Sequence, residues 1–281
     1  MSTTPEQIEA SGARAALYRD APGWEGAKTA AFGGFACDSA AAGTELIESI
    51  ASRLEQEGFD ALIGPMDGDT WHSYRVVTES DGSAPFLLEP VSGPHDLEVL
   101  TGAGFQPISE YVSTRAPLAD AVSGARPEVD GVTVTPWDGQ NAEAFLGHLF
   151  DMSSAAFSGN RFFKPITKEE LLELYRPVIP LVDPRHVLFA HAGDGRLVGF
   201  LFGMPNRAEG DVPESIILKT YASGMRGVGH LLADHFHRQA LDLGFSDVIH
   251  ALMHVDNVSS ARSGMHSAEV FRRYALMGRR L

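Results

Sequence analysis

The segment Lys219–Leu232 (KTYASGMRGVGHLL) contains residues whose types and spacing suit the binding of an anion. A β-branched and apolar stretch runs directly into Gly227-Val-Gly229, and an amphipathic stretch follows. Small residues at such a turn let backbone N–H groups approach a ligand closely, and the positive end of the following helix faces the same point. The segment therefore predicts a strand, a glycine-rich turn and a helix that bind a diphosphate through the turn amides of residues 225–230.

Two other kinds of phosphate loop do not fit this turn. A P-loop needs Lys and then Ser or Thr after its last glycine, whereas His230 and Leu231 follow Gly229 here. A dinucleotide loop follows the first strand of a parallel unit, whereas this turn follows a pattern typical of an antiparallel meander. A glycine-rich turn that only begins a helix stays open as an alternative.

The 11 histidines raise the question of a metal site. His235 and His237 lie two apart on a predicted helix and point in different directions. His250 and His254 lie four apart on a predicted strand, which separates them by about 13 Å. Neither spacing forms a chelate by itself, so we expect no metal.

The second half of the chain must supply the elements that position this turn. Hydrophobic periodicity and turn signals predict the following order. Strand 132–135 leads to helix 139–156, a second helix 167–175 with a Thr167/Glu170 capping box, a hairpin of 187–192 and 197–204 around Gly193-Asp-Gly195, strand 214–222, helix 229–243 and strand 247–253. We expect the last segment, 270–281, to close the same sheet.

The first half repeats part of this order. Residues 44–57 predict an amphipathic helix with Thr44 as its cap, and a glycine stop and a short strand at 60–64 follow it. This resembles helix 229–243 and its strand, and it favours a tandem duplication. The same succession also occurs in unrelated α/β proteins. The stretch 115–136 is the best linker candidate, so we expect domains at residues 1–125 and 126–281.

Composition limits the class of protein. The 281 residues are 44% hydrophobic and 21% charged, as in globular proteins. Apolar runs fall short of the roughly 20 residues of a membrane helix, the start does not resemble a signal peptide, and Cys37 is the only cysteine. We therefore expect a cytoplasmic protein without a membrane partner. The net charge of −15 argues against nucleic acid, and the acidic first half favours a cationic small-molecule partner.

Residues 216–257 resemble the GNAT superfamily of acyl-CoA-dependent acyltransferases. The hallmark of this family is Gln/Arg-x-x-Gly-x-Gly/Ala between its fourth strand and third helix. Gly227 and Gly229 match the two glycines, with Gly224 where Gln or Arg is expected. Alternatively, Arg226 is the arginine of the motif and the loop is about two residues shorter. The first half, especially 60–90, is similar to the companion half of bacterial two-GNAT proteins. It has no glycine-rich loop of this kind at the end of a strand, so we interpret it as a degenerate repeat.

This resemblance implies a fold and an activity. The fold would be α/β, with two GNAT-like domains in tandem, each a central, mostly antiparallel twisted sheet flanked by helices. The activity would be that of an N-acyltransferase, in particular an N-acetyltransferase. It would move an acyl group directly from acetyl-CoA or another acyl-CoA to an amine of a small molecule, without a metal. The oligomeric state is left as monomer or homodimer. A non-catalytic acyl-CoA-binding or sensor protein of the same fold is the alternative.

The resemblance also assigns site residues. The main chain of 220–222 would bind the thioester oxygen, Asn257 would bind the pantetheine arm, and loop amides would bind the diphosphate. The cofactor-binding set is Thr220, Tyr221, Ala222, Met225, Arg226, Gly227, Val228, Gly229, His230 and Asn257.

Proton transfer has several candidate residues. The family's usual tyrosine, about seven residues after the Asn, is replaced by Gly264. The catalytic candidates are therefore His254 and His266 with the main chain of Tyr221, and Tyr274 and Glu214 are further possibilities. The same side chains could also be ordinary surface or core-edge residues. The aromatic segment 157–165 is expected to border the acceptor, with Trp71, His72 and Tyr74 facing it.

Overall fold

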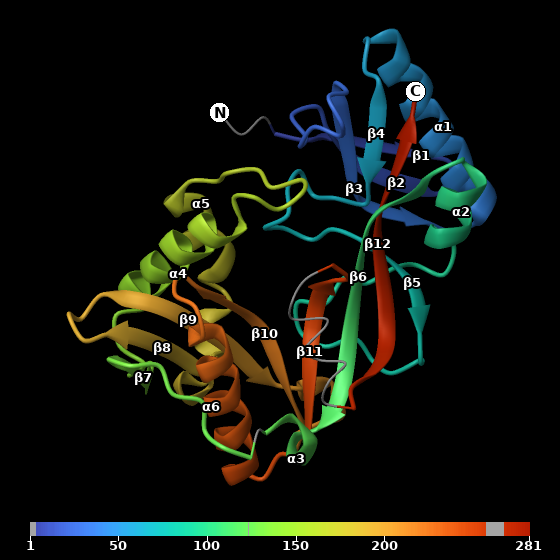
Figure 1. Ribbon diagram of the computed structural model, residues 1–281. Helices are drawn as coiled ribbons and strands as arrows, with labels where there is room; N and C mark the ends of the chain where they lie inside the picture. The colour runs from blue at the N-terminus through green and yellow to red at the C-terminus, as the bar shows by residue number, and fades with distance from the viewer. Residues whose placement is uncertain (1–3, 123, 257–266) are drawn as a thin grey trace. The chain divides into compact units, whose positions relative to one another are not determined.

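The computed structural model describes residues 4–122, 124–256 and 267–281, and the chain divides into two compact units (Figure 1). The N-terminal unit contains Met1–Tyr111, Asn160–Lys164 and Arg272–Leu281, and the C-terminal unit contains Val112–Gly159 and Pro165–Phe271. These units differ from the predicted domains 1–125 and 126–281. A unit defined by contacts and a domain defined by a repeat need not coincide, so that boundary stays a prediction. No helix within the described ranges has the length and apolarity needed to cross a membrane.

The N-terminal unit is a mixed sheet with strand order β1-β2-β3-β4-β12, and β5 pairs with β12. Among the described strand pairs of this unit, β3 and β4 alone run parallel, and α1 makes the crossover between them. Helix α1 packs on the sheet through an apolar face that includes Leu46, Ile50 and Leu54. The elements are β1 (Glu6–Ala10), β2 (Ala13–Tyr18), β3 (Thr29–Cys37), α1 (Ala40–Gln56), β4 (Ala61–Gly64), β5 (Val76–Ser80), α2 (Asp96–Gly102), β6 (Gln106–Pro117) and β12 (Glu269–Arg280).

The predicted start of α1 was wrong. The helix begins at Ala40, and its cap is Ser39, whose Oγ accepts the N–H of Ala42 at 3.2 Å. Thr44 lies inside the helix. Alanine has the highest helix propensity, so the alanines after Ser39 extend the helix beyond its first amphipathic position.

The C-terminal unit has strand order β6-β11-β10-β9-β8-β7. The predicted β8–β9 hairpin is confirmed, with Gly195 at φ 82°, and so is the capping box of Thr167 and Glu170. Helix α6 packs on β8, β9 and β10 (Figure 1). The elements are α3 (Leu118–Ala121), β7 (Val132–Pro136), α4 (Ala142–Phe157), α5 (Lys168–Tyr175), β8 (Val187–Ala192), β9 (Leu197–Pro205), β10 (Ser215–Ser223), α6 (Val228–Asp242) and β11 (Asp247–His254).

The two units contain the same succession of elements. In each, antiparallel strands are followed by a parallel strand–helix–strand crossover, which is β3-α1-β4 in one unit and β10-α6-β11 in the other. This repetition supports the duplication that the sequence suggested.

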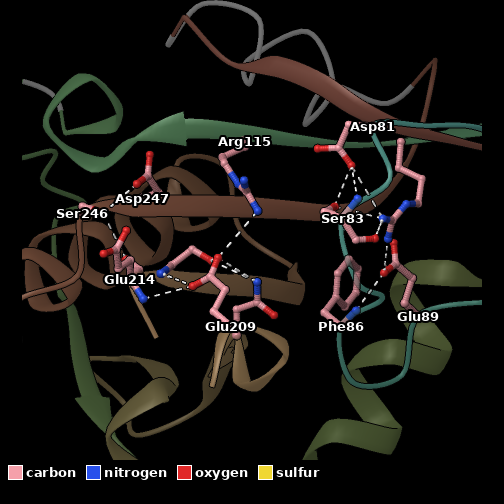
Figure 2. Close-up of polar contacts among 12 residues, drawn as sticks. Asp81, Ser83, Phe86, Glu89, Arg115, Glu209, Glu214, Ser246 and Asp247 are labelled. Atoms are coloured by element: carbon pink, nitrogen blue, oxygen red, sulfur yellow. Dashed lines mark hydrogen bonds and ion pairs between the residues drawn. The ribbon is translucent and has the colours of Figure 1, made fainter. Parts of the chain in front are cut away.

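The last strand, β12, joins the sheet as predicted, between β4 and β6, but most of it belongs to the N-terminal unit. Residues 277–280 of β12 pair with β4 and residues 272–275 pair with β5, so this part of the strand belongs to the N-terminal unit. Arg272, 4% exposed, donates at 2.6 Å to the buried carboxylate of Glu89, which also accepts the N–H of Phe86 (Figure 2). The Tyr274 hydroxyl donates to the other oxygen of Glu89. This buried network fixes the strand to its neighbouring loop.

A second polar network holds the start of β10. Glu209 accepts the backbone N–H groups of Glu214 and Ser215 and forms an ion pair with Arg115 (Figure 2). Burial opposes ionisation of Glu209, but hydrogen bonds from Ser215, Asn206 and the Glu214 amide outweigh it, so its pKa is lowered. The carboxylate therefore fixes where the strand begins.

Acid is expected to weaken the fold through His186. This side chain is 2% exposed and packs edge-on against Phe236 and Phe245. Burial lowers its pKa below the ordinary value, although nearby Asp183 opposes the shift. The unfolded chain therefore binds more protons, and stability present above about pH 6.5 is lost as the pH falls, by at most about 1.4 kcal/mol per unit for one proton.

Urea unfolding measured between pH 7.5 and 5.5 tests this expectation. The change His186→Gln should flatten the slope, and His191→Gln, which removes a half-buried imidazole on β8, serves as the control. Equal slopes for the wild type and His186→Gln would contradict the assignment.

Candidate functional site

Strands β10 and β11 part halfway along their length. They pair in parallel only from Ser215 with Asp247 to Leu218 with His250. Strand β10 then stays with β9 as far as Ser223, after a bulge between Leu218 and Thr220. Beyond His250, β11 is therefore no longer paired with β10, and a gap opens between the two strands.

The glycine-rich turn follows β10 at this gap. Gly227 has φ 88° and is the residue before α6, and no side chain caps the helix. The first regular helical hydrogen bond runs from Leu231 N–H to Gly227 O at 3.0 Å. The amides of Gly229 and His230 are consequently left without a helical partner, as at any helix start. This is the arrangement that the sequence predicted for an anion site.

A pocket of about 420 Å³ lies on this turn. Six predicted cofactor residues line it, together with two that were not assigned. The predicted residues are Tyr221, Met225, Arg226, Gly227, Gly229 and His230, and the additional ones are Ser223 and Gly224. Thr220, Ala222 and Val228 do not line it, and Ala222 and Val228 are buried. Ser223 could have been predicted as a pocket residue, since it is a polar residue between the strand and the turn, but the family hallmark does not include that position.

Close packing fixes the turn. A side chain at Gly229 would place its Cβ 3.1 Å from the ring of Tyr221 and 3.4 Å from Ser223 Oγ. On β9, a Cβ at Gly199 would lie 2.7 Å from Val228, and one at Gly203 would lie 2.3 Å from the ring of Phe236. Helix α6 thus lies directly on the backbone of β9, which holds its first turn beside the pocket.

His254 ends β11 and is half-buried. Its Nδ1 accepts the backbone N–H of Asp256 at 3.1 Å. In the neutral ring this contact leaves the hydrogen on Nε2, which can then donate. The regular alternation expected along the strand is interrupted at Leu252, which has φ 56°.

Asn257 and His266 lie outside the described residues, so their predicted roles stay predictions. Tyr274 lies in the N-terminal unit, buried, with its hydroxyl on Glu89. Glu214 precedes β10, and Tyr221 lies seven residues further along, roughly 20 Å away along an extended chain. Glu214 is therefore too far from Tyr221 to act on a thioester there.

A pair of histidines connects α6 with β11. His237 and His250 are buried, and their Nε2 atoms lie 3.1 Å apart. Spacing along the sequence pairs His237 with His235 and His250 with His254, so it does not reveal a contact that joins two elements. Among the described residues there is no group of three or more potential metal ligands.

The equivalent crossover in the N-terminal unit lacks an open turn. Ser39 Oγ already accepts the amide of Ala42 at the start of α1. The preceding residue, Asp38, carries a negative charge, which is unfavourable for an anion at this point. A Cβ at Gly43 would lie 2.8 Å from Val99 and 2.9 Å from Cys37 Sγ. This start of a helix is capped and packed, unlike that of α6.

The aromatic segment between α4 and α5 contacts the predicted partner. Trp71 Nε1 donates to Lys164 O at 2.9 Å, and its ring lies edge-on to Phe163 at 5.9 Å. Phe162, 6% exposed, packs in a core cluster with Ile63. Asn160–Lys164 is therefore part of the N-terminal unit.

Comparison with known proteins finds similarity in structure alone. No family model matches the chain, and no curated protein matches its sequence. A GCN5-related N-acetyltransferase from Sphaerobacter thermophilus is similar with a TM-score of 0.55 and 15% identity, over 96% of this chain and 76% of that one. The tandem GNAT protein from the clavulanic acid biosynthesis pathway, in a structure without AcCoA, gives 0.55 and 15%, over 95% and 78%.

A third structure, described as a probable N-acyltransferase from Enterococcus faecalis V583, gives a TM-score of 0.56 at 10% identity, over 96% of this chain and 59% of that one. At sequence identities this low, the structural similarity establishes the fold alone. The chain has the mixed α/β fold of the GNAT N-acetyltransferases, with a central sheet flanked by helices, and the predicted fold class is confirmed.

Proposed function

We propose that this GNAT-like chain is an acyl-CoA-dependent N-acyltransferase that moves an acyl group, in particular acetyl, directly to an amine of a small molecule. The observation that carries the proposal is the gap between β10 and β11 beside a turn with open amides. We further propose a tandem arrangement in which the N-terminal unit is the degenerate repeat, and a cytoplasmic location, as the single cysteine suggests.

The turn suits a diphosphate. The amides of Gly229 and His230 can donate to phosphate oxygens, and the positive end of α6 favours the negative charge. Arg226 and His230 line the same pocket and can add charge-assisted hydrogen bonds. Gly224, which takes the place of the hallmark Gln or Arg in one of the two alignments, has open space around it, so the pocket is not narrowed there.

The gap suits the thioester. The described parallel ladder of β10 with β11 ends at Leu218, and we place the thioester oxygen beside the main chain of Tyr221 and Ala222, further along β10. Attack by a neutral amine forms a C–N bond and breaks the C–S bond, and the proton lost by the attacking nitrogen passes to the leaving thiolate, which gives the amide and free CoA thiol. His254 would donate a hydrogen bond from Nε2 to the developing negative charge, since Nδ1 already accepts the Asp256 amide. Asn257 and His266 keep their proposed roles in cofactor binding and proton transfer.

Acetyl-CoA binding to the wild-type protein is the primary test. Thermal unfolding with acetyl-CoA at 100 times its dissociation constant should show stabilisation of about 2.7 kcal/mol, because the ligand binds only the folded state. Desulfo-CoA should stabilise similarly, whereas adenosine should not, since it lacks the diphosphate. No shift with acyl-CoAs of several chain lengths would contradict the proposal.

Turnover needs a separate measurement. CoA release can be followed with a thiol reagent across a panel of polyamines, amino sugars and amino acid amides, with Cys37 as the single background thiol. Release that depends on the amine would support an enzyme. Binding without release from any amine would favour the non-catalytic acyl-CoA-binding alternative.

A further inference from the structure

A buried hydroxyl lies beside the parted strands of the C-terminal unit. Ser113, on β6, is fully buried, and its Oγ accepts the backbone N–H of Leu252 at 3.1 Å. Leu252 lies two residues beyond His250, where the pairing of β11 with β10 ends. The contact therefore falls at the point where the gap has opened.

Leu252 has an unusual backbone conformation. Its φ of 56° is in the left-handed region, which residues other than glycine and asparagine rarely adopt. A β-strand amide normally donates to a carbonyl of the adjacent strand, and here a side-chain oxygen takes that place. Without Ser113 Oγ, the part-buried amide would need another acceptor, because an N–H withdrawn from water and left unpaired is unfavourable. If the parallel ladder continued past Leu218, a carbonyl of β10, the neighbour of β11 on the side opposite β6, would be the alternative acceptor.

We propose that Ser113 is a positioning residue for acyl-CoA binding. Its hydroxyl holds Leu252 in the left-handed conformation and so keeps β11 away from β10. This inference rests on the proposed function, which assigns the gap to the thioester. Ser113 belongs to the first half of the sequence but to the C-terminal unit of the structure. The strand β6 thus contributes a residue that acts on the geometry of the site without touching the ligand.

Ser113→Ala tests the proposal, with Ser109→Ala as its matched control. Ser109 is on the same strand and is 4% exposed, but its Oγ donates to Tyr111 OH within the N-terminal unit. Isothermal titration with acetyl-CoA should show about tenfold weaker binding for Ser113→Ala, since only the fraction of molecules with separated strands can bind. Ser109→Ala should bind like the wild type.

A second substitution separates positioning from general destabilisation. Glycine adopts φ 56° at little energetic disadvantage, so Leu252→Gly in the Ser113→Ala background should recover most of the lost affinity. A crystal structure of Ser113→Ala should show the β10–β11 ladder extending beyond Leu218 and His250. Unchanged affinity in Ser113→Ala, an equal loss in Ser109→Ala, or no recovery with glycine would overturn the proposal.

Failure of the proposed acyl-CoA function can be distinguished from failure of the proposed role of Ser113. If the wild-type protein does not bind acetyl-CoA, the proposed function fails. The role of Ser113 is then judged by strand pairing alone: an extended ladder in Ser113→Ala supports it, and strands that remain apart overturn it.

Discussion

Aspartate in place of Gly229 is expected to remove measurable acetyl-CoA binding, with at least roughly a 100-fold loss of affinity, while the fold stays intact. The new carboxylate would stand on the first turn of α6, among the amides that the proposal assigns to the diphosphate. Repulsion between such charges at about 4 Å amounts to roughly 4 kcal/mol near a protein surface. Acidic side chains stabilise the first turn of a helix, but a Cβ at this position lies 3.1 Å from the Tyr221 ring, which must shift slightly. Gly229→Asn, which makes the same steric change without the charge, should therefore bind much more tightly than Gly229→Asp.

The control for this experiment carries the same charge elsewhere. Gly124 is exposed, a Cβ added to it would have no atom within 4 Å, and its backbone does not require a positive φ. Gly124→Asp should therefore bind acetyl-CoA with wild-type affinity in the same titration. Tight binding by Gly229→Asp would show that the diphosphate lies elsewhere, and an unfolded Gly229→Asp is detected by circular dichroism before titration.

Replacement of Glu89 by glutamine is expected to have the largest effect on stability, about 3–5 kcal/mol in urea unfolding. Arg272 and Glu89 are both buried, with side chains 4% and 0% exposed. Glutamine keeps the shape but removes the buried counterion of the guanidinium, which keeps the part-exposed Asp81 carboxylate at 3.8 Å. It also changes the acceptor of the Tyr274 hydroxyl. Because Arg272 is on β12, the loss should also raise hydrogen exchange in the ladder between β12 and β5.

Glu79 provides the matched control. It forms an ion pair at 3.0 Å with Arg273, the next residue of the same strand, but both side chains are largely exposed. Exposed pairs contribute about 0–1 kcal/mol, so Glu79→Gln should unfold almost like the wild type. Equal midpoints for the two variants would mean that burial of the Arg272 pair does not stabilise the protein.

Local patterns predicted much of the C-terminal unit. The β8–β9 hairpin, the capping box at Thr167 and the strand–turn–helix around Gly227 all depend on residues close together in sequence. Turn chemistry and periodicity act over the same short range, so a single sequence is enough to identify them. Six of the residues assigned from the loop consequently line one pocket.

Contacts between distant elements could not be predicted in this way. The alternation of 270–281 suits any position in a sheet, and its place between β4 and β6 depends on partners such as Glu89, far away in sequence. The pair His237–His250 likewise arises only when α6 lies on β11. Ser113 has no motif at all, since its role depends on the backbone of Leu252.

The placement of Arg272–Leu281 in the N-terminal unit has a consequence for biosynthesis. The ribosome makes β4 long before β12, so a nascent chain carries an incomplete sheet whose β4 edge is exposed until translation reaches the far end of this sequence. Uncovered edges readily pair with other chains, and such nascent species are aggregation-prone. Chaperone occupancy on this protein should therefore persist through synthesis of both halves, rather than ending when the first half emerges.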